Sequence, residues 1–205
     1  MILGADCIAE GADWLCRAEP RFADVMPLVT PLPLRLKPDG FAELLSAIVS
    51  QQVSVASANA IWGRLQAAGM VTPAAVAAET EEGLRALGLS RPKARYAKAL
   101  AEAQIDYDAL HGLPVDQVIA TLTAVPGIGV WTAEIYAMFS LGRADVFAHG
   151  DLALQEAAKV LFDLPERPKE KAMRALAADW SPWRSVAARI LWAYYRVMKQ
   201  REGIR

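Results

Sequence analysis

The sequence predicts an all-α protein arranged as two helical lobes. Apolar residues recur with the three- and four-residue spacing of an amphipathic helix along nearly the whole chain. Short breaks that contain glycine or proline separate the helical stretches, as turns between packed helices do. The 205 residues, 54% of them hydrophobic, suffice to bury one core or two small ones.

A proline-rich run, MPLVTPLPLRL at 26–36, is the first break in the helical pattern. Proline opposes a helix there and discourages a strand, so we expect an extended linker. No other stretch marks a domain boundary as clearly. We therefore expect a helical bundle over 37–143 and a second lobe built from 1–36 and 144–205.

Two helices should follow the linker, one on each side of the short break SQQ at 50–52. Their apolar positions are Phe41, Leu44, Leu45 and Ile48, then Val55, Ala58, Trp62 and Leu65. The last helix has the clearest pattern, because Ser181 and Pro182 supply a cap and a first-turn proline before one continuous apolar stripe. That stripe consists of Trp183, Val186, Ala187, Ile190, Leu191, Tyr194, Tyr195 and Met198.

Charge and cysteine content limit the classes of function. A net charge of −1 argues against indiscriminate nucleic-acid binding, although basic residues gather locally. One cluster is SRPKARYAK at 90–98, and the other comprises Arg184, Arg189, Arg196, Lys199, Arg201 and Arg205 against the single acid Glu202. Such clusters are most often solvated faces. Cys7 and Cys16 lack the spacing and number of a metal site, which predicts reduced thiols in a cytoplasmic protein.

The break VPGIG at 125–129 lies between two stretches that both have helical spacing. Gly127 and Gly129 are poor helix formers whose main advantage is their freedom to take positive φ. A helix that starts at Trp131 would point its first backbone N–H groups outward, and such a terminus favours an anion. The pattern alone does not identify the anion, since many helix–turn–helix elements contain glycine.

The longer stretch LTAVPGIGVWTAEIYAMFSLGRADVFAHGD at 122–151 resembles the signature of the helix-hairpin-helix (HhH-GPD) DNA glycosylase superfamily, and within it the 3-methyladenine DNA glycosylase II branch. FAELLSAIVSQQVSVASANAIWGRL is similar to that branch's paired helices around the loop that probes the duplex. WSPWRSVAARILWAYY is similar to its C-terminal helix. The resemblance covers about 41–198 and implies a two-lobed helical fold, without the N-terminal sheet domain of some members.

The resemblance also assigns roles to the hairpin. Its backbone amides are expected to grip a DNA phosphate, so that VPGIG positions the duplex without reading its sequence. The residues concerned are Pro126, Gly127, Ile128 and Gly129. No cofactor is expected, although a structural Na⁺ or K⁺ is expected to fit against the main-chain carbonyls of Thr123, Val125 and Ile128.

Asp151 matches the family's catalytic aspartate. An aspartate after Gly150 and before an apolar run is also an ordinary helix cap, and the two roles are compatible. A helix N-terminus should keep the carboxylate ionised at neutral pH. An ionised carboxylate cannot be the general acid, but it can stabilise an oxocarbenium-like transition state and orient or deprotonate the attacking water.

Three aromatic residues are expected to line the base pocket: Trp131, Trp192 and Tyr136. Trp192 lies off the apolar stripe of its helix, on the face of Arg189 and Arg196, where an aromatic is more often a lone packed residue. By resemblance it stacks on the flipped base, and an indole favours a cationic purine. Trp131 occupies the position where strand-cutting relatives carry a lysine, so no Schiff base is expected.

The remaining DNA contacts are also expectations from the resemblance. Either Gln51 or Gln52 should enter the gap left by the flipped nucleotide, unless both are ordinary loop residues. Lys93 and Arg95 should contact phosphates. His149, in the loop before Asp151, is either a solvent or phosphate contact near the chemistry or, more commonly, incidental.

Together these features predict a monofunctional glycosylase that flips N-alkylated purines such as 3-methyladenine and 7-methylguanine out of double-stranded DNA and leaves an abasic site. Two alternatives stay open: the same fold acting on an oxidised or deaminated base, and a non-enzymatic helix-hairpin-helix DNA-binding module. We expect a monomer without membrane contact, in the cytoplasm and associated with a bacterial nucleoid.

Overall fold

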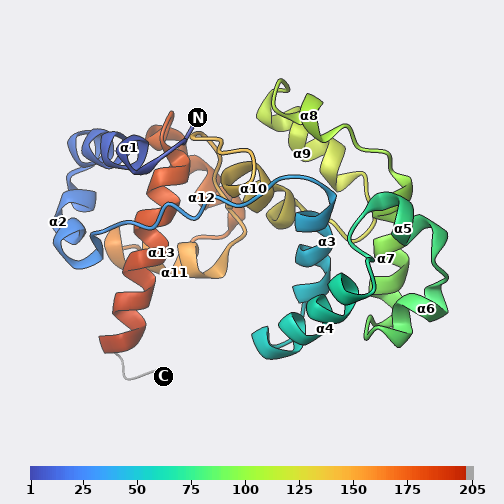
Figure 1. Cartoon of the computed structure of the whole chain (residues 1–205). Helices are drawn as coiled ribbons and strands as arrows, with labels where there is room; N and C mark the ends of the chain where they lie inside the picture. The colour runs from blue at the N-terminus through green and yellow to red at the C-terminus, as the bar shows by residue number, and fades with distance from the viewer. Residues whose placement is uncertain (202–205) are drawn as a thin grey trace. The chain divides into compact units, whose positions relative to one another are not determined.

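The computed structural model describes residues 1–201, and of Arg201 the backbone alone. Every regular element in this part of the chain is a helix, which confirms the all-α prediction (Figure 1). The chain forms two compact units. Unit 1 comprises Met1–Leu36 and the residues from Ala137 onward, and unit 2 comprises Lys37–Tyr136. None of the described helices is both long and apolar enough to cross a membrane.

The two unit boundaries differ in kind. The first follows Leu36, at the end of the proline-rich run. The second follows Tyr136 and lies inside helix α10 (Val130–Phe139), whereas the sequence pattern placed it after Arg143. Turn residues mark where a helix ends, but a continuous helix can give one end to each of two cores, and the pattern does not reveal that.

Unit 1 is organised around its long C-terminal helix. α13 (Arg184–Arg201) packs against α1 (Ala5–Ala18), α2 (Pro20–Val29) and α11 (Leu152–Leu161). The short α12 (Glu170–Leu176) runs into the 3₁₀ turn η1 (Ala177–Trp180). In the core, the Trp180 ring lies 5.3 Å from Phe22 and 5.4 Å from Phe147, both in edge-on geometry.

Two expectations about unit 1 are wrong. α2 continues to Val29 and contains Pro27, so the extended segment begins only at Thr30. Pro27 lacks the N–H that would donate to Ala23 O, which costs one intrahelical bond close to the end of the helix. The helix ends at its C-cap Thr30, where Met26 O accepts both Thr30 N and Thr30 Oγ1. Ser181 does not cap the last helix: α13 begins at Arg184, and the Ser181 hydroxyl donates to Asp145 instead.

Unit 2 is a bundle of short helices with well-formed caps. Its elements are α3 (Phe41–Ser50), α4 (Val55–Ala67), α5 (Pro73–Ala78), α6 (Glu81–Ala86), α7 (Arg91–Glu102), α8 (Tyr107–Leu110), α9 (Val115–Thr123) and the first turns of α10. α7 packs against α3, α5 and α6. Side-chain oxygens of five N-cap residues accept a backbone N–H, which stabilises helices too short to persist alone. These caps are Ser54, Thr72, Thr80, Ser90 and Asp106.

The predicted apolar faces of α3 and α4 are largely buried. Leu44, Leu45, Ile48 and Leu65 all belong to the core. Val55 is the exception: 77% of its surface is exposed, next to the exposed Val53. The break between α3 and α4 therefore presents aliphatic side chains to solvent.

Candidate functional site

Asp151 is fixed by two hydrogen bonds to the same carboxylate oxygen. As the N-cap of α11, its Oδ1 accepts the backbone N–H of Leu154 at 3.0 Å. The same oxygen accepts the indole Nε1–H of Trp192 at 3.2 Å. The positive end of the α11 dipole stabilises a negative charge at this position. The half-buried carboxylate is thus held in one orientation by a helix terminus and by α13.

Trp192 is held between Asp151 and a second aromatic ring. Its ring centroid lies 5.8 Å from that of Phe139, with 32° between the ring planes. The Arg189 guanidinium carbon lies 4.7 Å from the centroid of the Phe139 ring. The Nε1 edge of the indole is occupied by its hydrogen bond to the Asp151 carboxylate. A planar ligand can therefore contact Trp192 only by stacking on a face of the ring.

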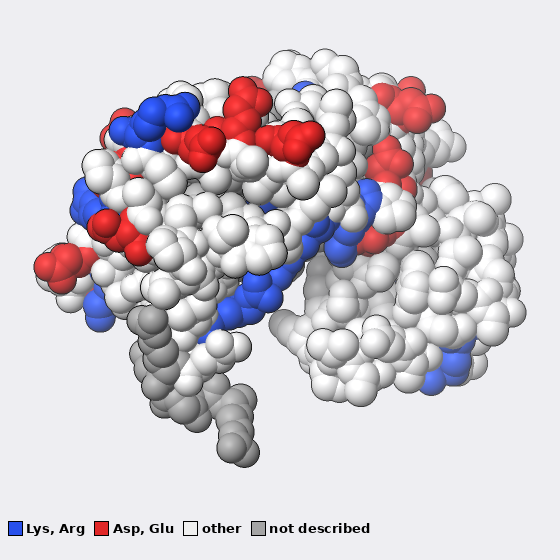
Figure 2. All heavy atoms as spheres, turned by 60° about the vertical axis from the view of Figure 1, so that its left-hand side comes forward, with Lys and Arg blue, Asp and Glu red and all other residues white. Residues whose placement is uncertain are grey.

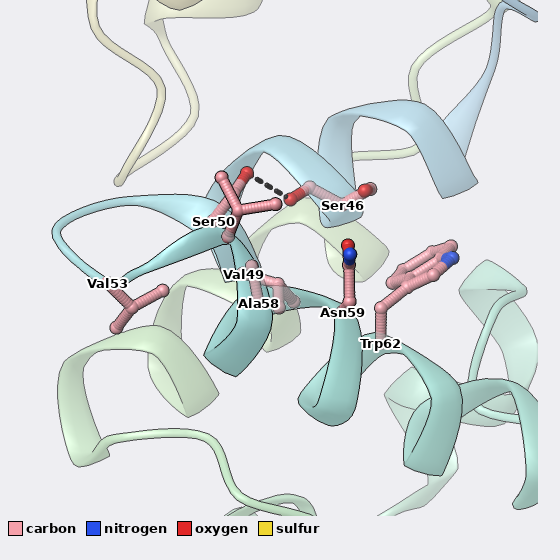
Figure 3. Close-up of a pocket in the computed structure, with 8 residues that line it drawn as sticks. Ser46, Val49, Ser50, Val53, Ala58, Asn59 and Trp62 are labelled. Carbon is pink, nitrogen blue, oxygen red and sulfur yellow. Dashed lines mark hydrogen bonds between the residues drawn. The ribbon is translucent and has the colours of Figure 1, made fainter. Parts of the chain in front are cut away.

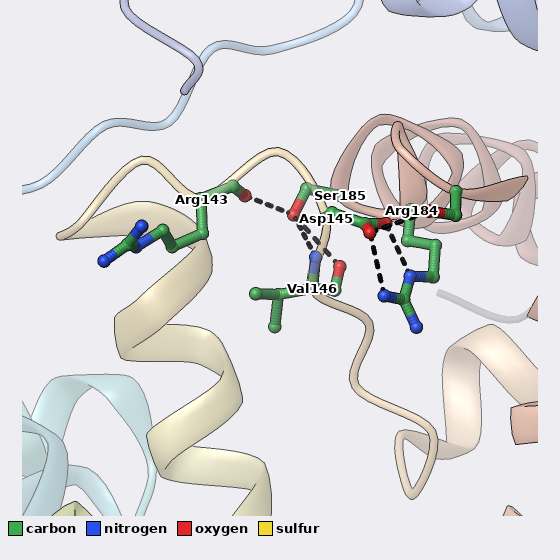
Figure 4. A network of polar contacts seen from close by, with 6 residues as sticks. Arg143, Asp145, Val146, Arg184 and Ser185 are labelled. Atoms are coloured by element: carbon green, nitrogen blue, oxygen red, sulfur yellow. Dashed lines mark hydrogen bonds and ion pairs between the residues drawn. The ribbon is translucent and has the colours of Figure 1, made fainter. Parts of the chain in front are cut away.

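The loop that leads to Asp151 is anchored to the start of α13 (Figure 4). The Ser185 hydroxyl donates to the carbonyl of Arg143 at 2.6 Å or to that of Val146 at 3.0 Å, and Arg184 pairs with Asp145. Burial opposes ionisation of Asp145, but hydrogen bonds from Arg184 and Ser181 outweigh it and lower the pKa of that carboxyl. Arg184, expected on an open basic face, is therefore committed to an ion pair.

His149 belongs to the core of unit 1. It is only 3% exposed, its ring lies 5.3 Å from Phe147, and its carbonyl accepts Gln155 Nε2 at 2.9 Å. A buried ring of this kind supports the loop before Asp151. This placement does not suit the solvent or phosphate contact that we considered for His149.

The turn between α9 and α10 requires glycine at one position and leaves open space at another. Gly127 has φ +92°, and a Cβ there would lie 2.4 Å from the Tyr96 ring. Gly129 has no neighbour within 4 Å of a would-be Cβ, and its carbonyl accepts the Ala133 N–H, so α10 begins one residue earlier than expected. Gly129, Val130 and Trp131 are all exposed. The N-terminus of α10 is accessible to an anion.

Thr123, Val125 and Ile128, whose carbonyls were expected to hold a monovalent cation, belong to the end of α9 and to this turn. Thr123 is the last residue of α9, where the helix dipole is negative, and Val125 O also accepts Ile128 N at 3.1 Å. Three neutral oxygens suit a monovalent cation better than a transition metal. Among the described residues no group of three or more His, Cys, Asp or Glu side chains could hold a metal ion.

The two glutamines of the α3–α4 loop have different environments. Gln51 Nε2 donates to Gly127 O at 3.0 Å and ties this loop to the hairpin. Gln52 is exposed and has φ +55°, a left-handed conformation that is uncommon for a residue with a Cβ. Gln52 is thus the glutamine that this loop exposes, together with the aliphatic Val53 and Val55.

A cavity of about 210 Å³ lies between α3 and α4 (Figure 3). Its polar lining consists of Ser46, Ser50 and Asn59, and Trp62 closes one end. The Ser50 hydroxyl donates a hydrogen bond of 2.7 Å to the carbonyl of Ser46. No carboxylate, histidine or cationic side chain lines this cavity, so it lacks the groups for acid–base or charge-stabilising chemistry.

Lys93 and Arg95 differ in exposure: Lys93 is buried and Arg95 is exposed. The Lys93 ammonium donates to Val49 O at 2.6 Å, near the C-terminus of α3, and burial lowers the pKa of Lys93. Because the Lys93 ammonium lies inside unit 2 and offsets the negative end of the α3 dipole, it is badly placed to contact a DNA phosphate. Arg95 is exposed two residues further along α7, and its contact with a phosphate stays a prediction.

The expected pocket aromatics outside unit 1 also differ in exposure. Trp131 is 49% exposed on the first turn of α10. Tyr136 is buried in unit 2, and its hydroxyl accepts the Gly40 N–H at 2.7 Å. Burial is the main reason that the pKa of Tyr136 rises to about 12, so this phenol stays neutral. Tyr136 acts in this unit as a packed, hydrogen-bonded residue.

Comparison with known proteins shows the family. The model of the HhH-GPD superfamily of base excision DNA repair proteins matches residues 45–182. This chain belongs to that superfamily. A Schizosaccharomyces pombe protein named DNA-3-methyladenine glycosylase 1 is 32% identical over 165 residues, which cover 76% of this chain and 72% of that protein.

Two solved structures extend the similarity over nearly the whole chain. A DNA-3-methyladenine glycosidase from Bacillus halodurans superposes with a TM-score of 0.82 at 34% identity, covering 93% of this chain and 91% of the other. The Schizosaccharomyces pombe 3-methyladenine DNA glycosylase Mag1, in complex with abasic DNA, gives a TM-score of 0.76 at 29% identity, covering 89% and 95%.

In this HhH-GPD chain, sequence reasoning missed two residues that shape the site. Phe139 is the ring partner of Trp192, yet its position in an apolar run gave no sign of that contact. Arg189 belongs to a basic cluster for which a solvated face was expected, but it is 1% exposed and donates to the carbonyls of Ser185 and Leu34. Its i, i+3 spacing to Trp192 was the available signal. The side chain of Arg201 and all of Glu202 and Arg205 lie outside the described residues.

Proposed function

We propose that this chain is a monofunctional DNA glycosylase that hydrolyses N-alkylated purines out of double-stranded DNA. The observation that carries the proposal is the Asp151 carboxylate, capping α11 and hydrogen-bonded to Trp192 in a chain of the HhH-GPD superfamily. Relatives over most of its length are named DNA-3-methyladenine glycosylases. A single copy carries all of the groups that the reaction needs.

The carboxylate performs the charge-stabilising step. As the bond from N9 of the purine to C1′ of the sugar breaks, its electron pair goes to the base and positive charge develops on the sugar. Asp151 stabilises that charge, and a water molecule then attacks C1′ and gives its proton to the Asp151 carboxylate, from which it passes to solvent. A 3-methyladenine or 7-methylguanine base carries a positive charge while attached and leaves neutral. Such a base needs no general acid, so a carboxylate that stabilises charge suffices.

Trp192 serves the same reaction in two ways. Its indole N–H orients the carboxylate at 3.2 Å, while a face of its ring offers π electrons to a cationic base. Cation–π attraction of about 0.5–2 kcal/mol favours a methylated purine over its neutral parent. A flipped base that has already lost pairing stability costs less to extrude.

The DNA is held by unit 2 through the hairpin and the α3–α4 loop. The exposed N-terminus of α10 binds a phosphate with backbone N–H groups, and Gly129 leaves room for its close approach. A Na⁺ or K⁺ on the carbonyls of Thr123, Val125 and Ile128 would add positive charge beside that phosphate. Gln52 enters the space vacated by the flipped nucleotide, where its amide can hydrogen-bond the orphaned base.

The experiment that tests this function measures single-turnover release of methylated purines from duplex DNA, followed by alkaline cleavage at the abasic sites. The wild-type chain is expected to release 3-methyladenine and 7-methylguanine and to leave the strand intact until alkali is added. Release of uracil or 8-oxoguanine alone would assign the fold to another lesion. Binding without any release would make the chain a DNA-binding module.

A further inference from the structure

Unit 1 contains three arginines that lie near one another without a carboxylate. They are Arg35 in the linker after α2, and Arg189 and Arg196 on α13. In the described part of the chain no acidic side chain pairs with any of the three. Arg17 on α1 likewise has no ion pair with any described residue, whereas four other arginines of unit 1 have an acidic partner: Arg21, Arg167, Arg174 and Arg184.

Arg189 is the buried member of this cluster and holds the linker in place. Its Nη2 donates to Leu34 O at 3.0 Å and its Nη1 to Ser185 O at 2.9 Å, while its charge faces the Phe139 ring. Burial, and after it the charge of Arg35, lower the pKa of Arg189 to about 10. Its bonds to neutral carbonyls leave the positive field of Arg189 uncancelled.

Arg35 follows Leu34 directly and has φ +52°, so the chain turns there in the left-handed region. The Arg35 side chain is exposed, and burial and the charge of Arg196 both lower the pKa of Arg35. Arg196 is exposed on the same face of α13 as Arg189, two turns further on. Figure 2 shows a band of Lys and Arg side chains on the side of the molecule that it presents, with most of the acidic side chains of that side away from the band.

The exposed Arg35 and Arg196 repel each other and the buried Arg189 without a counter-charge, so their two charges do not serve the stability of the isolated fold. We propose that Arg35 and Arg196, backed by Arg189, form a phosphate-binding site of unit 1 whose ligand is a backbone phosphodiester of DNA. The exposed pair provides charge-assisted donors suited to phosphate oxygens. The buried guanidinium behind them adds a positive field and fixes the linker that carries Arg35.

The identity of the ligand as DNA rests on the proposed function. Arg196 is one helical turn beyond Trp192 on α13, about 6 Å along the axis. A phosphate bound there lies close to the nucleotide whose base meets the Trp192 ring. This site is separate from the hairpin, which belongs to unit 2. Unit 1 would thus hold the damaged strand itself, in addition to acting on its base.

The test compares two double variants with the same loss of charge. Arg35→Asn with Arg196→Gln removes the exposed pair, and asparagine tolerates the left-handed conformation at position 35. Arg167→Gln with Arg174→Gln is the matched control in the same unit, since each of these exposed arginines only pairs with a neighbouring glutamate. Affinity for a duplex with a tetrahydrofuran abasic analogue is measured by fluorescence anisotropy over a series of NaCl concentrations.

Each lost phosphate contact reduces the slope of log affinity against log salt by about one. The Arg35/Arg196 variant is expected to lose about two from this slope and to keep or raise its thermal midpoint, because repulsion is relieved. The control variant is expected to keep both the slope and the affinity of the wild type. A slope equal to that of the control would overturn the proposal.

Two further measurements distinguish DNA phosphate from free phosphate as the ligand, and distinguish failure of this proposal from failure of the proposed glycosylase function. If inorganic phosphate at constant ionic strength raises the thermal midpoint through Arg35 and Arg196 while the DNA slope does not change, the site takes free ions and the proposal fails. If the wild-type chain releases no methylated purine but the slope still falls by about two, the phosphate site stands and only the proposed function fails.

Discussion

The indole Nε1 of Trp192 donates a hydrogen bond of 3.2 Å to Oδ1 of Asp151, the same oxygen that caps α11. This contact links a residue expected only to stack on a base with the residue expected to perform the chemistry. The orientation of the carboxylate therefore depends on α13 as well as on α11. Stacking and charge stabilisation are coupled through one side chain.

Trp192→Phe separates these two roles. Phenylalanine keeps an aromatic face beside Phe139 but cannot donate to Asp151, and a hydrogen bond to a charged group contributes about 1.5–3 kcal/mol. The single-turnover excision rate should fall by up to about 100-fold, whereas affinity for abasic-site DNA should change little. Trp192→Leu should cost more, because it also removes the π face. Equal rates for wild type and Trp192→Phe would exclude the orienting role.

The two hairpin glycines should respond differently to alanine. Gly127→Ala places a Cβ 2.4 Å from the Tyr96 ring at φ +92°, so the free energy of unfolding should fall by roughly 2–5 kcal/mol. Gly129→Ala meets no protein atom within 4 Å and should fold normally, yet bind DNA more weakly because its methyl group occupies the space left for the phosphate. Urea unfolding and anisotropy titration measure the two effects. Normal DNA affinity in Gly129→Ala would contradict phosphate binding at this turn.

The exposed Trp131 predicts the chemistry of the product. Tryptophan has no amine, so borohydride should trap no covalent complex between this chain and DNA, and the strand should break only after alkali or heat. A glycosylase with a catalytic lysine, run in parallel, supplies the positive control. A trapped adduct would reveal an amine nucleophile elsewhere in the chain.

Gln52 should matter for DNA and not for folding. Gln52→Gly removes the side chain while keeping the left-handed backbone, and the matched control is Gln104→Gly, another residue of unit 2 with positive φ. We expect slower excision for Gln52→Gly and wild-type excision for Gln104→Gly, at similar thermal midpoints. Gln51→Ala should instead lose about 0.5–1.5 kcal/mol of stability with its bond to Gly127 O. Equal excision by the two glycine variants would remove Gln52 from the mechanism.

The sequence predicted the helices well because helical burial repeats at a fixed spacing. It failed where one residue's role depends on a distant partner. Pro27 lies inside α2 three residues before its C-cap Thr30, so the proline costs only one bond of the last turns, and the spacing rule for proline does not include that. Val55 continues an apolar stripe but lies where α4 begins, beyond the cover of α3.

In the candidate site, too, the sequence predicted roles that depend on a local motif better than roles that depend on distant contacts. Asp151 and the hairpin glycines were found from their motif, since these positions are local in sequence. The choice between Gln51 and Gln52 required the backbone conformation of the loop. Lys93 was expected at a phosphate, but its ammonium is used by Val49 O across 44 residues of chain. Long-range contacts of this kind leave no periodic trace in a single sequence.

In the proposed reaction the Asp151 carboxylate acts on purines that are already cationic. Asp151→Asn is the variant that tests it, because asparagine caps a helix about as well as aspartate does but carries no charge. Asp106→Asn, at the N-cap of α8, is the matched control for a capping aspartate. Both variants should unfold within about 0.5 kcal/mol of the wild type.

The decisive measurement is single-turnover excision from matched duplexes that carry 3-methyladenine, 7-methylguanine, uracil or 8-oxoguanine. The wild-type chain and Asp106→Asn should release the two methylated purines quickly and the two neutral lesions slowly. Asp151→Asn should release none of the four, while it still binds abasic-site DNA. Near-wild-type release by Asp151→Asn, or uracil or 8-oxoguanine released faster than 3-methyladenine, would contradict the account.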